Sequence, residues 1–144
     1  MTRFSILILL CMACFGLKAQ VGISYYPFQS EVGINSNVDK LLWGDLRLAS
    51  NTFYGNITTE TNVMWNVKRY QKVSVYTGLG ANFNFFNAAG DLPITNGYAA
   101  FAGCRFRFSK AWPGLQLAFE LSPYFNTSFS GGTLRSSLGL AYQF

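Results

Sequence analysis

Seven charged side chains lie within stretches in which apolar and polar residues alternate, and all seven fall on the polar side of that alternation. They are Asp45, Arg47, Glu60, Arg105, Arg107, Glu120 and Arg135. Three carboxylates and four guanidinium groups can form ion pairs, because the planar fork of arginine can bind several carboxylates. We therefore predict an interior network of charges. Polar neighbours are expected to complete it: Tyr76, Asn82, Asn84, Gln116 and Gln143.

Enzymatic chemistry has little support in the residue types. A nucleophile needs an adjacent base, most often histidine, and the chain has no histidine. A serine with a lysine or glutamate base is conceivable, but no spacing singles one out. The segment Gly78-Leu-Gly80 has too few glycines for a nucleotide-binding loop. We predict no enzymatic activity, no cofactor and no zinc site of the usual ligand set.

The composition favours a membrane β-barrel over a water-soluble domain. The chain has 144 residues, of which 12% are charged and 50% are apolar, and this share of charge is low for a surface that faces water. No internal apolar run reaches the about 20 residues that a membrane-spanning helix needs. Strand alternation reconciles these observations, because it places the apolar residues on one face of each strand. The positive charge is modest, and nucleic-acid binding has no support.

A period of two in the side chains predicts eight β-strands, since successive residues of a strand point to opposite faces. The expected strands are residues 21–28, 31–36, 41–49, 56–68, 72–86, 97–109, 115–125 and 133–144, with turns at 29–30, 37–40, 69–71 and 110–114 and loops at 50–55, 87–96 and 126–132. The first two strands are the least regular, because Pro27 interrupts the pattern. We predict an all-β fold: a closed, antiparallel transmembrane β-barrel of about eight strands in an up-and-down meander.

The first nineteen residues have the pattern of a secretory signal peptide. Arg3 gives a positive start, an apolar run covers residues 4–17, and Ala19 is a small residue at the expected cleavage site. A retained anchor and a lipoprotein signal at Cys11 or Cys14 are weaker alternatives. Cleavage would leave a barrel domain of residues 20–144 with nine basic and six acidic residues. It would also leave Cys104 as the single cysteine, so we expect no internal disulfide.

The last strand carries a family resemblance. Leu140, Tyr142 and Phe144 alternate with small or polar residues, and the chain stops on the aromatic Phe144. This pattern resembles the C-terminal strand of outer-membrane β-barrel proteins, where it is associated with recognition by the barrel-insertion machinery. Residues 20–144 as a whole resemble a small barrel of the OmpA/OmpX type. The resemblance implies the outer membrane of a Gram-negative bacterium, with outer-membrane lipids and the barrel-assembly machinery as partners.

Aromatic residues are expected to form two belts at the two membrane interfaces, where amphipathic rings are favoured. With both termini at the lower, periplasmic end, the upper belt would contain Phe83, Phe85, Tyr98 and Phe125, and the lower belt would contain Trp65, Phe106, Phe108, Trp112, Tyr142 and Phe144. Basic residues fall in or beside the lower turns: Lys40, Arg69, Lys72 and Lys110. They could meet phospholipid headgroups, or they could simply be solvated.

These observations predict an integral outer-membrane protein with a structural or surface-interaction role and a lumen filled by side chains. One alternative is a narrow channel or a barrel subunit of a larger envelope complex. Another is a soluble, secreted ligand-binding barrel, in which the apolar side chains would point inward and the charges outward. The sequence indicates neither a surface ligand nor a protein partner.

Overall fold

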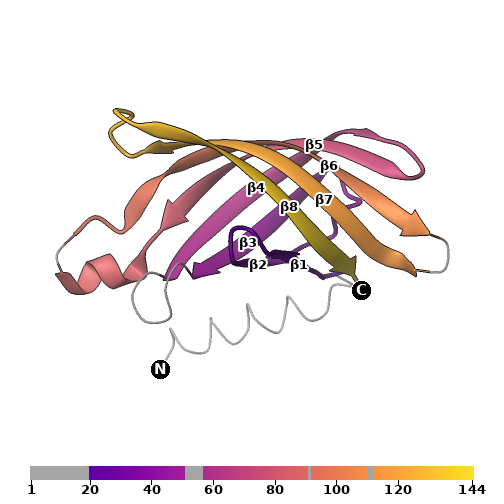
Figure 1. Cartoon of the computed structure of the whole chain (residues 1–144), viewed down its shortest axis with the longest axis horizontal. Coiled ribbons are helices and arrows are strands. Elements are labelled where there is room, and N and C mark those ends of the chain that lie inside the picture. Colours follow the sequence, from indigo (N-terminus) through magenta and orange to yellow (C-terminus); the bar gives the residue numbers. More distant parts are fainter. Residues whose placement is uncertain (1–19, 51–56, 91, 110–111) are drawn as a thin grey trace, which may run out of the picture.

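The structure, a computed structural model, describes residues 20–50, 57–90, 92–109 and 112–144 (Figure 1). The expected signal peptide, residues 1–19, lies outside the described residues, as does most of the expected loop at 50–55. Among the described residues, no helix is long and apolar enough to cross a membrane.

Eight strands form one closed sheet in the order of the sequence. They are β1 (Gly22–Tyr26), β2 (Glu31–Asn35), β3 (Leu42–Ser50), β4 (Ile57–Arg69), β5 (Val73–Phe83), β6 (Thr95–Ser109), β7 (Trp112–Asn126) and β8 (Gly132–Gln143). Each strand pairs antiparallel with the next, and β8 closes the ring by pairing with β1. The predicted closed, antiparallel, eight-stranded meander is therefore confirmed.

The two ends of the barrel differ in their connections. The upper end carries the β1–β2, β5–β6 and β7–β8 connections together with the end of β3 and the start of β4, and the lower end carries the β2–β3 and β4–β5 turns together with the end of β6 and the start of β7. In Figure 1 the β5–β6 and β7–β8 connections lie at the left and the β4–β5 turn at the right, with the strands running obliquely between them.

Four strand ends differ from the predictions by two or more residues, and one of them is the start of β6 at Thr95 instead of residue 97. Strand β5 ends at Phe83 instead of residue 86, and a 3₁₀ helix, η1 (Phe85–Gly90), follows it. Asn84 causes this change, because its side chain accepts a hydrogen bond from Phe86 N at 3.0 Å and draws the backbone out of the strand. Strand β7 begins at Trp112, within the expected turn at 110–114, because proline is tolerated near the start of a strand. Strand β1 ends at Tyr26, before Pro27.

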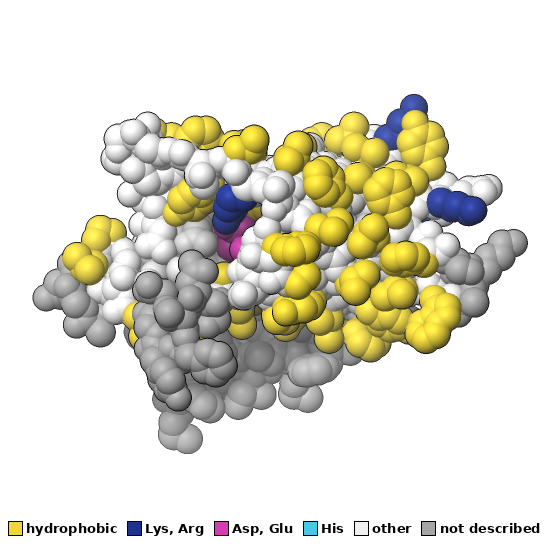
Figure 2. Space-filling view, viewed as in Figure 1, with side chains coloured by type: hydrophobic (Ala, Val, Ile, Leu, Met, Phe, Trp, Pro, Cys, Tyr) yellow, Lys and Arg dark blue, Asp and Glu magenta, His cyan; other side chains and the backbone are white. Residues whose placement is uncertain are grey.

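Alternate residues of the strands face inward and outward. Exposed apolar side chains cover much of the described surface on the face that Figure 2 shows. On β3, for example, Leu46 and Leu48 are exposed while Asp45 and Arg47 are buried. The buried side chains on the inward faces are mostly polar or charged, together with an aromatic-rich cluster that includes Trp43, Tyr76 and Phe101.

Two inward-facing glycines make room for tyrosine rings inside the barrel. A Cβ added at Gly139 would lie 2.5 Å from Cδ1 of Tyr26, and one added at Gly103 would lie 2.6 Å from Cζ of Tyr76. Both distances are below van der Waals contact, so each ring lies directly against the backbone of a neighbouring strand. This close packing holds the two tyrosine hydroxyls at fixed positions.

Replacement of Gly139 by alanine is expected to lower the free energy of unfolding by about 1–3 kcal/mol, because the new methyl group overpacks against Tyr26. Gly44→Ala is the matched control. Its Cβ would meet nothing closer than Asn62 O at 4.0 Å, so it should be neutral or slightly stabilising. Thermal unfolding of the detergent-folded proteins measures both effects. Equal unfolding temperatures would contradict the proposed packing of Tyr26.

Candidate functional site

An ion pair between Arg47 and Glu120 lies at the centre of the buried polar side chains. Arg47 is on β3 and Glu120 is on β7, and closure of the barrel brings them together across 73 residues of sequence. The guanidinium donates from Nη1 to Oε2 at 2.7 Å and from Nη2 to Oε1 at 2.9 Å. Both residues are at most 2% exposed. This bidentate geometry is the strongest form of arginine–carboxylate pairing.

Two tyrosine hydroxyls complete the bonding of Glu120. Tyr26 and Tyr76 donate to Oε1 at 2.9 Å and 2.5 Å. The carboxylate therefore accepts four hydrogen bonds, two of them from the guanidinium of Arg47. A buried carboxylate is tolerated only with such compensation, since burial of an unpaired charge costs several kcal/mol.

Arg47 is also enclosed on its other sides. Its Nε donates to Asp45 Oδ2 at 2.6 Å, and Nη1 lies 3.9 Å from Glu31 Oε2. The guanidinium carbon lies 4.5 Å from the ring centroid of Tyr26 and 5.2 Å from that of Phe101. Arg47 thus contacts three carboxylates and two aromatic faces, which an arginine can do because its planar group bonds at its edge and stacks on its faces.

Two further ion pairs lie toward the ends of the barrel. Arg135 donates from Nη2 to Glu60 Oε2 at 3.0 Å, and its guanidinium carbon lies 5.1 Å from the ring centroid of Tyr124. Arg107 pairs with Asp39 of the β2–β3 turn. The Arg107 and Asp39 side chains are 33% and 46% exposed, so water screens this pair far more than the central one.

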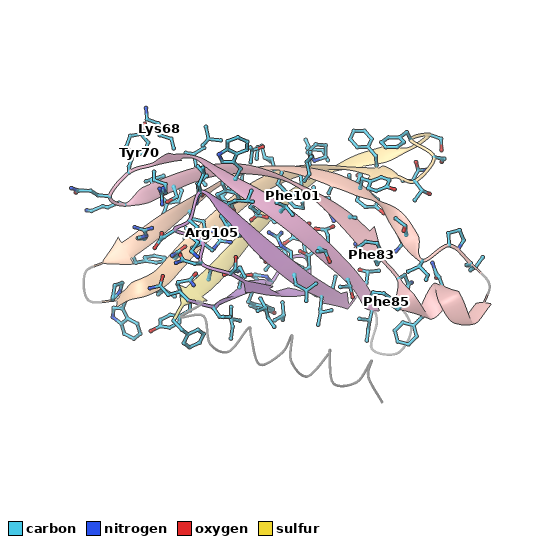
Figure 3. All side chains as sticks on the ribbon, turned by 180° about the vertical axis from the view of Figure 1, so that it is seen from behind. Lys68, Tyr70, Phe83, Phe85, Phe101 and Arg105 are labelled. Carbon is cyan, nitrogen blue, oxygen red and sulfur yellow. The ribbon has the colours of Figure 1, made fainter. Side chains whose placement is uncertain are left out.

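Arg105 is buried without a carboxylate partner among the described residues. It is 3% exposed, and its three side-chain nitrogens have no hydrogen-bond acceptor there. Its guanidinium carbon lies 4.4 Å from the Trp43 ring centroid and 5.5 Å from that of Tyr76. In Figure 3 it lies between the strands, nearer than Phe101 to the end that carries Lys68 and Tyr70. Its environment is a cation–π stack.

The structure brings some of the predicted network together and separates the rest. Asp45, Arg47 and Glu120 form one cluster with Tyr76, whereas Glu60–Arg135, Arg107 and Arg105 have separate environments. Of the predicted partners, Asn82 accepts a hydrogen bond from Asn96 of β6 and Asn84 accepts one from Phe86 N of η1 instead. The side-chain amide of Gln143 has no partner among the described residues, and no described hydrogen bond links Gln116 to the charges.

Six participants were not predicted from the sequence: Tyr26, Glu31, Asp39, Trp43, Phe101 and Tyr124. Alternation on β1 places Gly22, Ser24 and Tyr26 on one face, and this signal could have identified Tyr26 as an inward residue. Trp43 shares a parity with Asp45 and Arg47 and could have been found in the same way. Asp39 lies in a turn, where alternation gives no information.

The predicted aromatic belts map to the two ends of the barrel. Most of these rings are exposed at the ends expected for them: Phe85, Tyr98 and Phe125 at the upper end, and Trp65, Phe106, Phe108, Trp112, Tyr142 and Phe144 at the lower end. Phe83 is half-buried and stacks on Phe85 of η1 at 6.3 Å between ring centroids. Phe129, which was not predicted, stacks on Tyr98 at 5.9 Å.

The predicted C-terminal signal lies on the outside of β8. Leu140, Tyr142 and Phe144 are exposed, and the last two rings meet edge to face at 5.1 Å. This strand pairs with β1 through Leu140 and Tyr142. Leu140 and Tyr142 are therefore on the strand that closes the barrel, and Phe144 directly follows it.

The described ranges contain no evident site for metal binding or for thiol chemistry. Within them, no group of three or more His, Cys, Asp or Glu side chains could hold a metal ion. Cys104 is a free, half-buried thiol on β6. What the site can do chemically is to pair charges and present hydrogen-bonding groups at the two ends of the barrel.

Comparisons with known proteins give little additional information. No family model matches the chain, and no curated protein matches it. A solved structure of a de novo designed transmembrane β-barrel aligns over 88% of this chain and 92% of its own, with 19% identity and a TM-score of 0.47. Similarity at that level does not establish a common function.

Glu120→Gln is expected to destabilise the barrel by about 3 kcal/mol, because it removes the main counter-charge of a buried arginine. Asp39→Asn is the matched control, since it removes the carboxylate of a half-exposed pair and should cost less than about 1 kcal/mol. Denaturant unfolding of the detergent-folded proteins measures the difference. If the two variants lost equal amounts of unfolding free energy, Glu120 would not be the central partner of Arg47.

Proposed function

We propose that this chain is an integral outer-membrane β-barrel protein with a structural or surface-interaction role. The observation that carries the proposal is the distribution of side chains around the closed sheet. Large apolar side chains are exposed on all eight strands, including Leu79 at 71%, Val63 at 54% and Leu140 at 49%. A surface of this kind is unfavourable in water, at about 25 cal/mol per Å² of apolar area, and favourable in lipid.

The buried charges support the same proposal from the inside. A charged side chain on the lipid face of a barrel costs about 2–4 kcal/mol near the bilayer midplane. Arg47 and Glu120 lie near the middle of their strands, and Arg47, Arg105 and Glu120 are all at most 3% exposed. A soluble ligand-binding barrel would reverse this arrangement, with apolar side chains inside and charges outside.

The proposed role follows from the side chains that fill the middle of the barrel interior. The Arg47–Glu120 pair, Tyr26 and Tyr76 occupy the interior, and an eight-stranded barrel is only wide enough for its own side chains. The lumen is accordingly proposed to be a packed polar core, not an open pore. The expected partners are outer-membrane lipids and, during insertion, the barrel-assembly machinery, which would recognise Leu140, Tyr142 and Phe144.

Cell fractionation combined with gel mobility tests the location. The protein is expected in the outer-membrane fraction, and its mobility should change on boiling, because a folded barrel resists unfolding in mild detergent. Recovery of the full-length barrel domain as a monodisperse protein in buffer without detergent would refute the proposal.

An arginine scan along β8 tests contact with lipid. Leu138→Arg, near the middle of the strand, should cost about 2–4 kcal/mol, whereas Leu134→Arg, near the upper end, should cost about 0–1 kcal/mol. Both leucines are exposed, so a water-soluble barrel would tolerate the two changes alike. Unfolding free energies in phospholipid vesicles measure the difference.

Planar-bilayer recordings test the packed interior. We expect no steady conductance from the wild-type protein, because charged and aromatic side chains fill the middle of the barrel interior. A steady single-channel conductance that changed on Glu120→Gln would support the channel alternative instead.

A further inference from the structure

A pocket of about 290 Å³ opens at the upper end of the barrel. Its walls include Gln29 of the β1–β2 turn, Glu31 of β2, Asn82 of β5, Tyr124 of β7 and Arg135 of β8. The volume is several times the about 30 Å³ that a water molecule occupies in the liquid. The pocket is therefore large enough for a small organic group.

Glu31 is the buried carboxylate with the longest ion-pair contact in the described ranges. Its Oε2 lies 3.9 Å from Arg47 Nη1, and that nitrogen donates to Glu120 at 2.7 Å. Among the described residues, no donor forms a hydrogen bond with the Glu31 carboxylate, although the residue is only 9% exposed. A buried carboxylate in this condition is costly unless a donor or a cation satisfies it.

Other oxygens at the same end also lack donors among the described residues. Gln29 donates through Nε2 to Ser136 O at 2.6 Å, but its Oε1 is buried and has no donor. Glu60 binds Arg135 through Oε2 at 3.0 Å, and its Oε1 is likewise buried without a donor. The charge of Arg135 is already neutralised by Glu60. Nε of Arg135 is also buried without an acceptor, but among the described residues the upper end still presents more unsatisfied acceptors than donors and has an excess of negative charge.

We propose that this pocket binds a primary ammonium group on a short alkyl chain, with Glu31 as its counter-ion and the amide oxygen of Gln29 as a second acceptor. An ammonium group brings three donors and one positive charge, which matches the weakly paired carboxylate of Glu31 and the further oxygen acceptors beside it. A divalent ion fits less well, because calcium takes six to eight oxygen ligands with several carboxylates among them. An anion would lie against the carboxylate of Glu31, although Nε of Arg135 in the same pocket lacks an acceptor.

The ammonium group could belong to a free small amine or to a lysine side chain of a protein partner. These two sources share the same chemistry, and two probes separate them. n-Butylammonium represents the free amine, and a short peptide with a central lysine represents the protein. The site belongs to the open end of the barrel, so the inference does not depend on the proposed membrane location.

The test is calorimetric titration of the folded full-length barrel with each probe and with Mg²⁺. Saturable binding of at least one ammonium probe is expected, and the lysine peptide should bind more tightly if the source is a protein. Glu31→Gln should weaken binding about tenfold or more, since a hydrogen bond to a charged group contributes about 1.5–3 kcal/mol. Asp39→Asn, which removes a carboxylate at the opposite end, should bind as the wild type does.

A second test uses NMR spectroscopy of the wild-type protein and needs no variant. The side-chain amide resonances of Gln29 should shift on addition of n-butylammonium, whereas those of Gln116 should not. If Glu31→Gln does not fold, as judged by heat-modifiable mobility, Gln29→Leu replaces it and should weaken binding severalfold.

Three outcomes would overturn the inference: no saturable binding of either ammonium probe, equal affinity of the wild type and Glu31→Gln, or tight binding of Mg²⁺ alone. The first result would indicate that Glu31 is satisfied by a proton. A barrel that dissolves in buffer and still binds n-butylammonium through Glu31 would refute the proposed membrane location and leave this inference intact.

Discussion

The whole structure depends on the pairing of Arg47 with Glu120 inside a closed sheet. A barrel of eight strands directs one face of each strand into a narrow space, so every charge on those faces must find compensation there. The bidentate contact, with Tyr26 and Tyr76 on the same carboxylate, provides it at the centre. Because the central charges are paired inside, most of the large apolar side chains of the strands can face outward.

The two ends of the barrel differ in charge and in accessible space. At the upper end, Glu31 lies at a pocket among oxygen acceptors. At the lower end, a pocket of about 460 Å³ is lined in part by Lys72, Arg107 and Asp39. Charged groups across the centre separate the two pockets. The proposed role is therefore one in which the protein presents its ends to partners and does not pass solutes through its middle.

The sequence determined the strands and the face of each inward residue. A period of two is a local property: on β3 it separates Asp45 and Arg47 from Leu46 and Leu48 without reference to any other strand. Eight such stretches joined by short connections predicted the meander correctly. The local signal failed at strand ends, where the side chain of Asn84 competes for backbone hydrogen bonds and starts η1.

Only the tertiary structure decided which inward residues meet. Alternation along the strands predicts that Arg47, Arg105 and Glu120 all face the interior. Their relative positions along the barrel axis are set by the register of each strand pair and by the closure of β8 on β1. That geometry places Glu120 on Arg47, stacks Arg105 on Trp43 and leaves Glu31 at the upper pocket. Contacts across the barrel depend on the positions of all eight strands at once, and no single stretch of sequence contains that information.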